Sequence, residues 1–278
     1  MPELPEVQAH AERLQADFGG ATLRRFQPIS FTALKTFKPD PSKAAGAELA
    51  SVGRRGKHLL LDFGTLTFVV HLMQGGRLVP DTKQAVKPRG GIARWSFDDG
   101  RALLLTEAGT ERKAGVWVLE GDLDGQAPLD ELGPEADRLE PPALLALLHE
   151  HPMRLHGFLR DQRILAGLGR RLANEVCHRA RLSPFANTAK LDATDAGNLT
   201  EAIRVCVDDG LAYERGRADM SKSKDRPGSV HGRAGEACPV CGDTVRSVEY
   251  TRYRVDYCAT CQTGGKVLAD NTTSKFLK

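Results

Sequence analysis

Four cysteines near the C-terminus have the spacing of a metal site. Cys238 and Cys241 form one C-x-x-C pair, and Cys258 and Cys261 form a second pair after sixteen intervening residues. Each pair places two thiolates on one tight turn, and two such turns can close a tetrahedral Zn²⁺ site. Four sulfur ligands leave no position for water, so we expect one structural zinc ion. Two unrelated redox dithiols are the alternative, but such sites use a single pair beside a βαβ unit.

The segment between the two cysteine pairs, residues 244–257, has the pattern of a β-hairpin. Its strand-forming residues are Val245, Val248, Tyr250, Tyr253 and Val255. Arg252 and Arg254 are expected either to project from this hairpin toward whatever it binds or to be solvated surface charges. The other two cysteines, Cys177 and Cys206, lie on predicted helices and are expected to be buried thiols.

Positive charge is concentrated in the middle of the chain. The 278 residues carry a net charge of only +3, yet residues 151–190 contain eight Lys and Arg against Asp161 and Glu175. Residues 120–140 have the opposite balance, with eight acids against Arg138. Binding to phosphate requires local rather than overall positive charge, so the basic segment is a candidate nucleic-acid surface. A solvated helix face explains the same charges equally well.

A glycine-containing turn lies inside this basic segment. Gly167-Leu168-Gly169 precedes Arg170 and Arg171 at the start of a predicted helix. Backbone N–H groups at a helix start can bind an anion, and the two arginines add positive charge there. An ordinary loop is the alternative, and the absence of a G-K-[ST] sequence excludes an ATP-binding P-loop.

The elements that must position these residues fall into at least two groups. Residues 4–18 have apolar side chains at helical spacing and end at two glycines. From residue 21 to residue 119, short apolar runs alternate with turn residues, which predicts an antiparallel sandwich or barrel. Its clearest strands are residues 58–63, 66–71, 93–97 and 102–105, with a hairpin turn at Asp99-Gly100.

The second half of the chain is predicted to be mainly helical. An acidic stretch with Pro and Gly, residues 120–142, indicates a linker. Helices are predicted over residues 142–149, 153–159, 171–180 and 193–210. Residues 213–236 are polar and without periodicity, so we expect a mobile loop there.

Neither a membrane nor an export route is indicated. No stretch approaches the ~18 consecutive apolar residues of a membrane span. The start of the chain is acidic and proline-rich, unlike the basic and then apolar layout of a signal peptide. We therefore expect a cytoplasmic protein whose thiols stay reduced; the resemblance described next further implies a place within the bacterial nucleoid.

Five segments, taken together and in order, resemble the bacterial formamidopyrimidine-DNA glycosylases of the wider Fpg/Nei family, which includes endonuclease VIII. They are MPELPEV at 1–7, RRGKHLLL at 54–61, HLMQGGRL at 71–78, GLGRRLANE at 167–175 and VHGR at 230–233. Each segment alone is only suggestive. Their shared order over nearly the whole chain makes the combined resemblance specific, and the departures noted below indicate a divergent member.

The resemblance implies an α+β multidomain fold with DNA held between its two main parts. It implies an N-terminal β-sandwich with a leading helix over residues 1–119 and a linker over 120–142. A helix–two-turn–helix domain would cover residues 143–236, and a four-cysteine zinc finger residues 237–265. Residues 266–278 would form a C-terminal tail. We expect the protein to act as a monomer on double-stranded DNA that contains damaged bases or abasic sites.

The resemblance also implies a reaction at the N-terminus, namely excision of oxidised bases and cleavage of the abasic strand. Once Met1 is removed, Pro2 carries a secondary amine that could attack the sugar and form an iminium ion. An α-amino group titrates near ~8, so part of it is neutral at pH 7. Glu3 would carry the proton, Glu6 would support it, and Lys57 would contact a phosphate or the lesion. Alone, these residues would indicate an ordinary helix start and a solvated lysine.

Further DNA contacts follow from the resemblance, with departures from the family pattern. The expected contacts are His71, Gln74, Lys113, Arg170, Arg252 and Arg254. Family members fill the space of the displaced base with Met, Arg and Phe, and here Gln74, Lys113 and Ala114 match those positions. Arg170 replaces the family's asparagine, and Tyr253 stands at the position of the finger arginine.

Two alternatives to a glycosylase with abasic-site lyase activity remain at this stage. The first is a protein that binds damaged DNA without catalysis, which the missing aromatic wedge favours and the intact Pro2-Glu3 and Lys57 oppose. The second is an abasic-site lyase with weak glycosylase activity.

Overall fold

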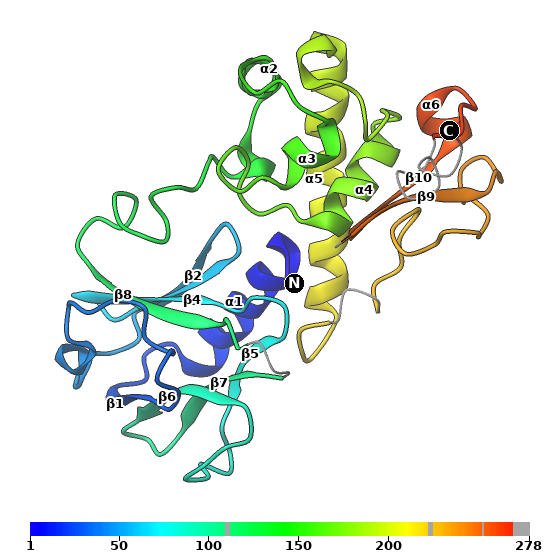
Figure 1. The fold of residues 1–278 in the computed structure, drawn as a ribbon. Helices are drawn as coiled ribbons and strands as arrows, with labels where there is room; N and C mark the ends of the chain where they lie inside the picture. The colour runs from blue at the N-terminus through cyan, green and yellow to red at the C-terminus, as the bar shows by residue number, and fades with distance from the viewer. Residues whose placement is uncertain (109–111, 222–224, 252, 269–278) are drawn as a thin grey trace. The chain divides into compact units, whose positions relative to one another are not determined.

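A computed structural model describes residues 1–108, 112–221, 225–251 and 253–268. The chain forms two compact units (Figure 1). Unit 1 comprises Met1–Leu132 and the short segment Ala218–Met220, and unit 2 comprises Gly133–Arg217 and Ser221–Lys278. In the described part of the chain, no helix combines the length and apolar character needed to cross a membrane.

Unit 1 begins with helix α1 (Leu4–Phe18), which has the predicted bounds. Its apolar side chains, Val7 and Leu14 among them, are almost fully buried. The helix starts with a capping box, in which the Glu3 side chain accepts from the backbone of Glu6 and the Glu6 side chain accepts from the backbone of Glu3. This reciprocal pair satisfies N–H groups that have no partner within the helix.

Two four-stranded antiparallel sheets form the body of unit 1 (Figure 1). One sheet has the order β1 (Leu23–Pro28), β6 (Gly91–Phe97), β7 (Ala102–Glu107) and β5 (Gly76–Pro80). The other has the order β2 (Ser51–Arg55), β3 (His58–Asp62), β4 (Leu66–His71) and β8 (Gly115–Glu120). A short 3₁₀ turn, η1 (Pro41–Ala44), lies between β1 and β2 in the sequence.

The two sheets share one apolar core, as a sandwich requires. Phe26, Phe68 and Trp95 meet there with ring centroids 5.0 to 5.9 Å apart. The core also contains Met220, from the segment that follows the long helix of unit 2. The predicted N-terminal β-sandwich with a leading helix is therefore confirmed.

The acidic stretch after β8 contributes side chains to unit 1 rather than leaving them in solvent. Leu129 is buried beside Leu119 and Val69, and Leu123 and Leu132 pack against the same cluster. Apolar residues spaced through an otherwise acidic segment explain this packing. The division between the units falls after Leu132, and the five-part domain division expected from the sequence stays a prediction.

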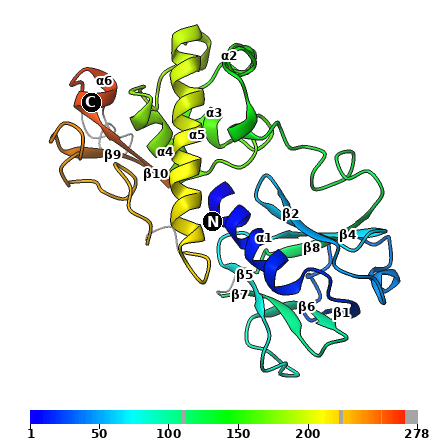
Figure 2. The same ribbon diagram turned by 180° about the vertical axis from the view of Figure 1, so that it is seen from behind.

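Unit 2 is built on helices (Figure 2). They are η2 (Ala136–Arg138), α2 (Pro141–Glu150), α3 (Leu155–Arg160), α4 (Arg170–Arg179), η3 (Thr188–Lys190) and α5 (Ala193–Arg215). Helix α5 does not end at Gly210 as predicted. It continues because Glu214 is fully buried and accepts hydrogen bonds from the backbone N–H and the hydroxyl of Ser221.

The C-terminal hairpin consists of β9 (Val245–Tyr250) and β10 (Tyr253–Cys258), followed by the short helix α6 (Ala259–Thr263). The register pairs Val248 with Val255, and both side chains are buried. The hairpin is attached to the helices through Gln262, whose amide donates to the Leu182 carbonyl over 3.0 Å. Helix α6 was not expected from the sequence.

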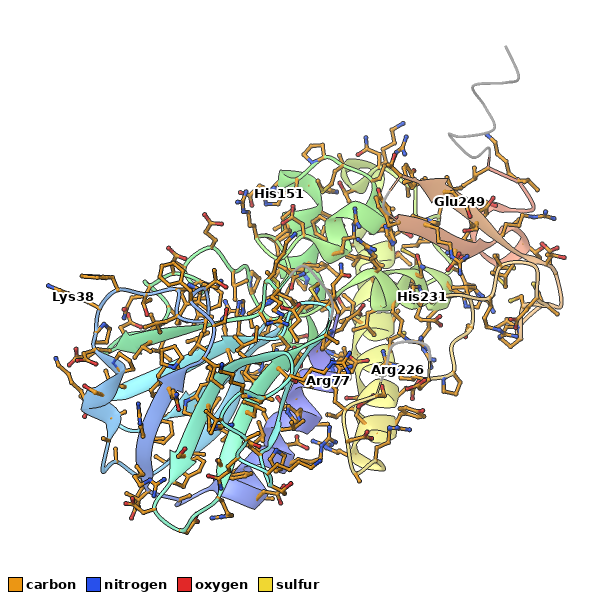
Figure 3. The ribbon with its side chains drawn as sticks, turned by 60° about the horizontal axis from the view of Figure 1, so that its bottom comes forward. Lys38, Arg77, His151, Arg226, His231 and Glu249 are labelled. Atoms are coloured by element: carbon orange, nitrogen blue, oxygen red, sulfur yellow. The ribbon has the colours of Figure 1, made fainter. Side chains whose placement is uncertain are left out.

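The segment before the hairpin was predicted as a mobile loop over residues 213–236, of which residues 222–224 lie outside the described part. Within its described remainder, residues 229–231 are held by one carboxylate. Glu175 on α4 accepts from the backbone N–H groups of Ser229, Val230 and His231 over 2.8, 3.2 and 2.8 Å. Figure 3 labels His231, whose Nδ1 lies 2.9 Å from the Asn174 amide nitrogen. Residues 229–231 thus form an ordered segment along α4, which we call the strap.

Candidate functional site

The N-terminal residues form a buried polar group in unit 1, which we call the N-terminal site. Pro2 is buried, and the side chains of Glu3 and Glu6 are only 6% and 3% exposed. The backbone N–H of Glu3 donates to Glu6 Oε2 over 2.9 Å. Since Glu6 holds the backbone of Glu3 through the capping box, the position of Glu3 relative to the chain start is fixed.

Two cations lie near the Met1 amino group of this site. Burial lowers the pKa of the Met1 amino group, and Lys57 and Arg77 lower it further, whereas Glu3 and Glu6 act in the opposite direction. Lys57 follows β2 and is 4% exposed, and Arg77 lies on β5 (Figure 3). A lowered pKa increases the fraction of neutral, nucleophilic amine at pH 7. Arg77 was not singled out by the sequence, because an arginine on a strand gives no local signal.

His71 lies opposite His58 across the β3–β4 pair. Their ring centroids are 4.6 Å apart. Burial lowers the pKa of His71 to about 4, with a contribution from Lys57. Its Nδ1 accepts the backbone N–H of Met73 over 3.0 Å, so the neutral ring carries its proton on Nε2. His71 is therefore a neutral hydrogen-bond donor rather than a cation.

The three positions matched to the family's gap-filling side chains differ in their exposure. Gln74 and Lys113 are exposed, and Gln74 follows Met73, whose φ of 51° is unusual for a residue other than glycine. Ala114 is fully buried, and its N–H donates to Glu107 Oε2 over 2.7 Å. Ala114 is thus part of the unit 1 framework and presents no side chain to a ligand.

Unit 2 carries a group of arginines and aromatic rings, which we call the arginine–tyrosine cluster. It consists of His156, Arg160, Arg170, Tyr250 and Tyr253. The Tyr250 and Tyr253 rings are stacked 4.7 Å apart. The Arg160 guanidinium carbon lies 3.9 Å from the Tyr253 ring centroid, and that of Arg170 lies 5.6 Å from it.

Neither arginine of this cluster forms an ion pair within the described residues. Arg170 is exposed at the first position of α4. His156 is 3% exposed, its Nε2 has no hydrogen-bond partner in the described part of the chain, and burial lowers its pKa to about 3. Cations above a tyrosine face and at a helix start suit a phosphate group. The sequence had indicated Arg170 alone, because α3 and the hairpin meet only in the fold.

The two finger arginines are not equivalent. Arg254 on β10 is about half-exposed, and its Nε lies 3.5 Å from Oδ1 of the buried Asp256. Asp256 also accepts from the Ser247 hydroxyl and the Gly232 N–H. Arg254 is therefore tied to the hairpin, whereas Arg252 lies outside the described residues.

The four cysteines come together at the base of the hairpin. Sγ of Cys238 lies 3.9 Å from that of Cys261, and Sγ of Cys241 lies 3.4 Å from that of Cys258. Sulfurs bound to one tetrahedral Zn²⁺ at about 2.3 Å would be about 3.8 Å apart. Both sulfur pairs lie near this distance, so the donor set fits zinc.

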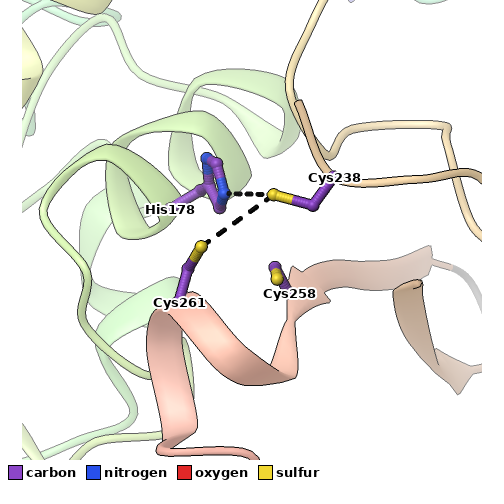
Figure 4. Close-up of side chains that lie close together, drawn as sticks. All are labelled: His178, Cys238, Cys258 and Cys261. Atoms are coloured by element: carbon purple, nitrogen blue, oxygen red, sulfur yellow. Dashed lines mark hydrogen bonds between the residues drawn. The ribbon is translucent and has the colours of Figure 1, made fainter. Parts of the chain in front are cut away.

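A histidine joins this group (Figure 4). The donor atoms of His178, Cys238, Cys258 and Cys261 all lie within 4.8 Å of one another. Cys241 is the exposed member of the cysteine set. Burial acts to raise the pKa of Cys238, but hydrogen bonds from the Val240 and Cys241 backbone and from His178 outweigh it and lower that pKa. His178 had no signal in the sequence, because a single helical histidine is more often an ordinary core residue.

A β-sandwich with a leading helix, followed by a helical unit and a four-cysteine hairpin, is the fold of the MutM/Fpg class of DNA glycosylases. The MutM (Fpg) protein of Thermus thermophilus superimposes with a TM-score of 0.80 at 28% identity, over 96% of this chain and 100% of that one. The formamidopyrimidine-DNA glycosylase of Chloroflexus aurantiacus is 31% identical over 277 residues, covering 94% of this chain and 98% of that protein.

Residues 1–116 match the model of the formamidopyrimidine-DNA glycosylase N-terminal domain. The chain therefore belongs to the formamidopyrimidine-DNA glycosylase family, as the resemblance of its five segments predicted. A formamidopyrimidine-DNA glycosylase-like protein of Mycobacterium tuberculosis is 41% identical over 149 residues, which cover 53% of this chain and 94% of that protein. Membership of this family makes the chain a DNA glycosylase by class.

Proposed function

We propose that this chain removes a damaged base from double-stranded DNA and then cleaves the abasic strand. The observation that carries the proposal is the buried N-terminal site. It combines a proline, a fixed carboxylate and a nearby lysine in a member of a glycosylase family. The reaction requires loss of Met1, because the nitrogen of Pro2 is otherwise an amide without nucleophilic character.

The first step is a substitution at the sugar. The lone pair of the Pro2 nitrogen attacks C1′, the C1′–base bond breaks, and the base leaves with the bonding electrons and takes up a proton. The sugar ring opens to give an iminium ion between Pro2 and C1′. Burial, Lys57 and Arg77 lower the pKa of the Met1 amino group, and we expect the same surroundings to keep the Pro2 amine neutral before attack once Met1 is removed.

The second step is an elimination. The iminium ion acidifies the C2′ proton, a base removes it, and the C3′–phosphate bond breaks, so the phosphate leaves with the electron pair. Glu3 is the candidate proton carrier in both steps, because it adjoins the amine and is fixed by Glu6. Lys57 is the candidate contact to the lesion or its phosphate.

The proposed partner is DNA whose damaged nucleotide is displaced from the stack. Arg170 and Arg254 are candidate phosphate contacts, as is Arg252, for which there is no structural description. In unit 1, His71, Gln74 and Lys113 are candidate contacts, His71 as a neutral donor. The Fpg protein of Lactococcus lactis, which shares the fold, was crystallised with DNA containing an abasic site, and we propose the same class of DNA here. The cysteine site would hold one Zn²⁺ that stabilises the hairpin.

One observation favours a second candidate function, an abasic-site lyase with weak glycosylase activity. Ala114 is fully buried where a wedge side chain would be needed to fill the gap left by a displaced base. An abasic site has no base to displace, so it would not require the wedge. The ratio of the cleavage rates on oxidised-base and abasic duplexes distinguishes the two functions.

Borohydride trapping tests the proposal directly. Protein lacking Met1 is mixed with duplexes that carry oxidised bases or an abasic site, and the reductant is added. A covalent protein–DNA adduct is expected with the unchanged chain. Far less is expected with Pro2→Gly, whose primary amine replaces the cyclic secondary amine, or with protein that retains Met1, whose amine stands one residue away. Both controls should still bind the abasic duplex. If no substrate yields an adduct, the chain only binds damaged DNA.

A further inference from the structure

His178 lies against the cysteine site of the finger although it belongs to a different element. It stands in the last turn of α4 and is 5% exposed. Its Nε2 is 3.3 Å from Cys238 Sγ (Figure 4). Five donor groups therefore surround a site in which zinc takes four ligands.

The sequence spacing separates the ligands from the additional group, because two C-x-x-C pairs already supply the four sulfurs that one zinc ion takes. Both sulfur pairs, at 3.9 and 3.4 Å, bracket the edge of about 3.8 Å that a zinc tetrahedron requires. They include Cys241 despite its exposure. The nitrogen-to-sulfur distance of 3.3 Å is in the range of an N–H···S hydrogen bond. With the four sulfurs as the ligands, His178 is left to interact with one of them.

The charge of the site explains why a donor is needed there. Four thiolates and one Zn²⁺ carry a net charge of −2, and Cys238 and Cys258 are only 2% and 0% exposed. Buried negative charge is costly unless hydrogen-bond donors stabilise it. Val230 and Val245 are apolar neighbours in the same cluster and donate no side-chain hydrogen bond.

We propose that His178 is a positioning residue of the metal centre, which donates its Nε2–H to the sulfur of Cys238. The bond stabilises the thiolate and attaches the metal to α4. Helix α4 begins at Arg170 and β10 begins at Tyr253, so the same attachment fixes two members of the arginine–tyrosine cluster relative to each other. The inference rests on metal binding by the cysteines and is independent of the proposed reaction.

Metal competition tests the proposal. His178→Phe fills the space without a donor, and His178→Gln keeps an amide donor. The matched control is His149→Phe on α2, whose Nε2 faces the Leu191 carbonyl. We expect His178→Phe to lower the affinity for Zn²⁺ about 10- to 100-fold, as loss of an outer-shell partner does. His178→Gln should restore most of the affinity, and His149→Phe should match the unchanged chain. Unchanged affinity in His178→Phe would overturn the proposal.

Two spectroscopic readouts on the unchanged chain do not depend on how the variants fold. In Co²⁺-substituted protein, the visible bands should indicate four sulfur ligands. In ¹¹³Cd-substituted protein, NMR should show a coupling between the metal and the Nε2 proton of His178, transmitted through the Cys238 sulfur. Bands of three sulfurs and one nitrogen would make His178 a ligand in place of Cys241. Either that result or a ring protonated only on Nδ1 contradicts the proposal.

Discussion

The N-terminal site of unit 1 and the arginine–tyrosine cluster of unit 2 use charge in opposite ways. In the N-terminal site, Glu3 and Glu6 are buried, and the side chain of each accepts a hydrogen bond from the backbone of the other. In the cluster, Arg160 and Arg170 come from different helices, and no carboxylate among the described residues pairs with them. A reacting group must be held at one place in a low-dielectric environment, whereas a phosphate contact must exchange water for its ligand.

The difference is also one of energetic cost. Burying a carboxylate is unfavourable unless hydrogen bonds compensate. Loss of one member of the N-terminal site therefore leaves another buried without its hydrogen bond. Guanidinium groups over tyrosine rings retain much of their hydration, and each contributes modestly. We therefore expect single substitutions in the N-terminal site to abolish catalysis, and single substitutions in the arginine–tyrosine cluster only to weaken DNA binding.

Removal of the metal should have the largest effect and should be confined to unit 2. The free energy of binding zinc to a four-cysteine site is folding free energy, typically about 10 kcal/mol or more. Chelation is therefore expected to unfold the hairpin and disperse the cluster, while the β-sandwich persists. Near-ultraviolet circular dichroism of Trp95 and Trp117 in unit 1, followed beside the tyrosine signals of the hairpin, measures this. Loss of both signals together would contradict the separation.

Glu3→Gln should have the next largest effect. The amide keeps an oxygen that can cap α1 but cannot carry the proton, so excision is expected to slow by about 10²- to 10⁴-fold. Single-turnover kinetics on an oxidised-base duplex give the rate, and thermal unfolding controls for the cap. A rate within a few-fold of the unchanged chain, at equal stability, would remove Glu3 from the mechanism.

Acid should destabilise unit 1 through His58. Burial, followed by the neighbouring His71, lowers the pKa of His58 to about 3 from 6.5. The unfolded chain therefore binds more protons than the folded one between about pH 3 and 6.5, and stability falls as the pH decreases through that window. At pH 4 the expected cost is about 3 kcal/mol for this group.

His58→Phe removes this titration and should reduce the pH dependence of the free energy of unfolding, of which the part due to His71, with a pKa of about 4, remains. Urea unfolding of the protein at pH 4 and pH 7, with and without the substitution, gives the comparison. An equal slope in both proteins would show that His58 is already protonated in the fold or does not resist protonation.

The smallest expected effect is in the cluster. Arg160→Gln and Arg170→Gln should each reduce the slope of log binding constant against log salt by about 1, the contribution of one phosphate contact. Arg163→Gln, an exposed arginine outside the cluster, is the control. Fluorescence anisotropy with an abasic duplex measures the slope, and trapping rates at saturating protein should not change. A slope unaffected by both changes would leave the cluster without a role in DNA binding.

Local pattern explains which parts of the molecule could be predicted from the sequence. Helix α1, the hairpin at 244–257 and the four cysteines depend on residues close together in the chain, and the structure has each of them. His178 and Arg160 were missed because their partners, Cys238 and Tyr253, are 60 or more residues away. The end of α5 was misplaced because Gly210 usually terminates a helix, whereas a buried carboxylate four residues later extends this one.

The contacts of Glu175 make one position unusually sensitive to mutation. Its carboxylate is the shared acceptor for three consecutive amides of the strap. An apolar substitution would leave all three N–H donors without their acceptor. This would reduce the stability of the fold by about 1 kcal/mol or more for each donor. Replacement of Val230 would alter only one of these neighbours. Because these hydrogen bonds go to backbone amides, they depend on Glu175 and not on which side chains stand at positions 229 to 231.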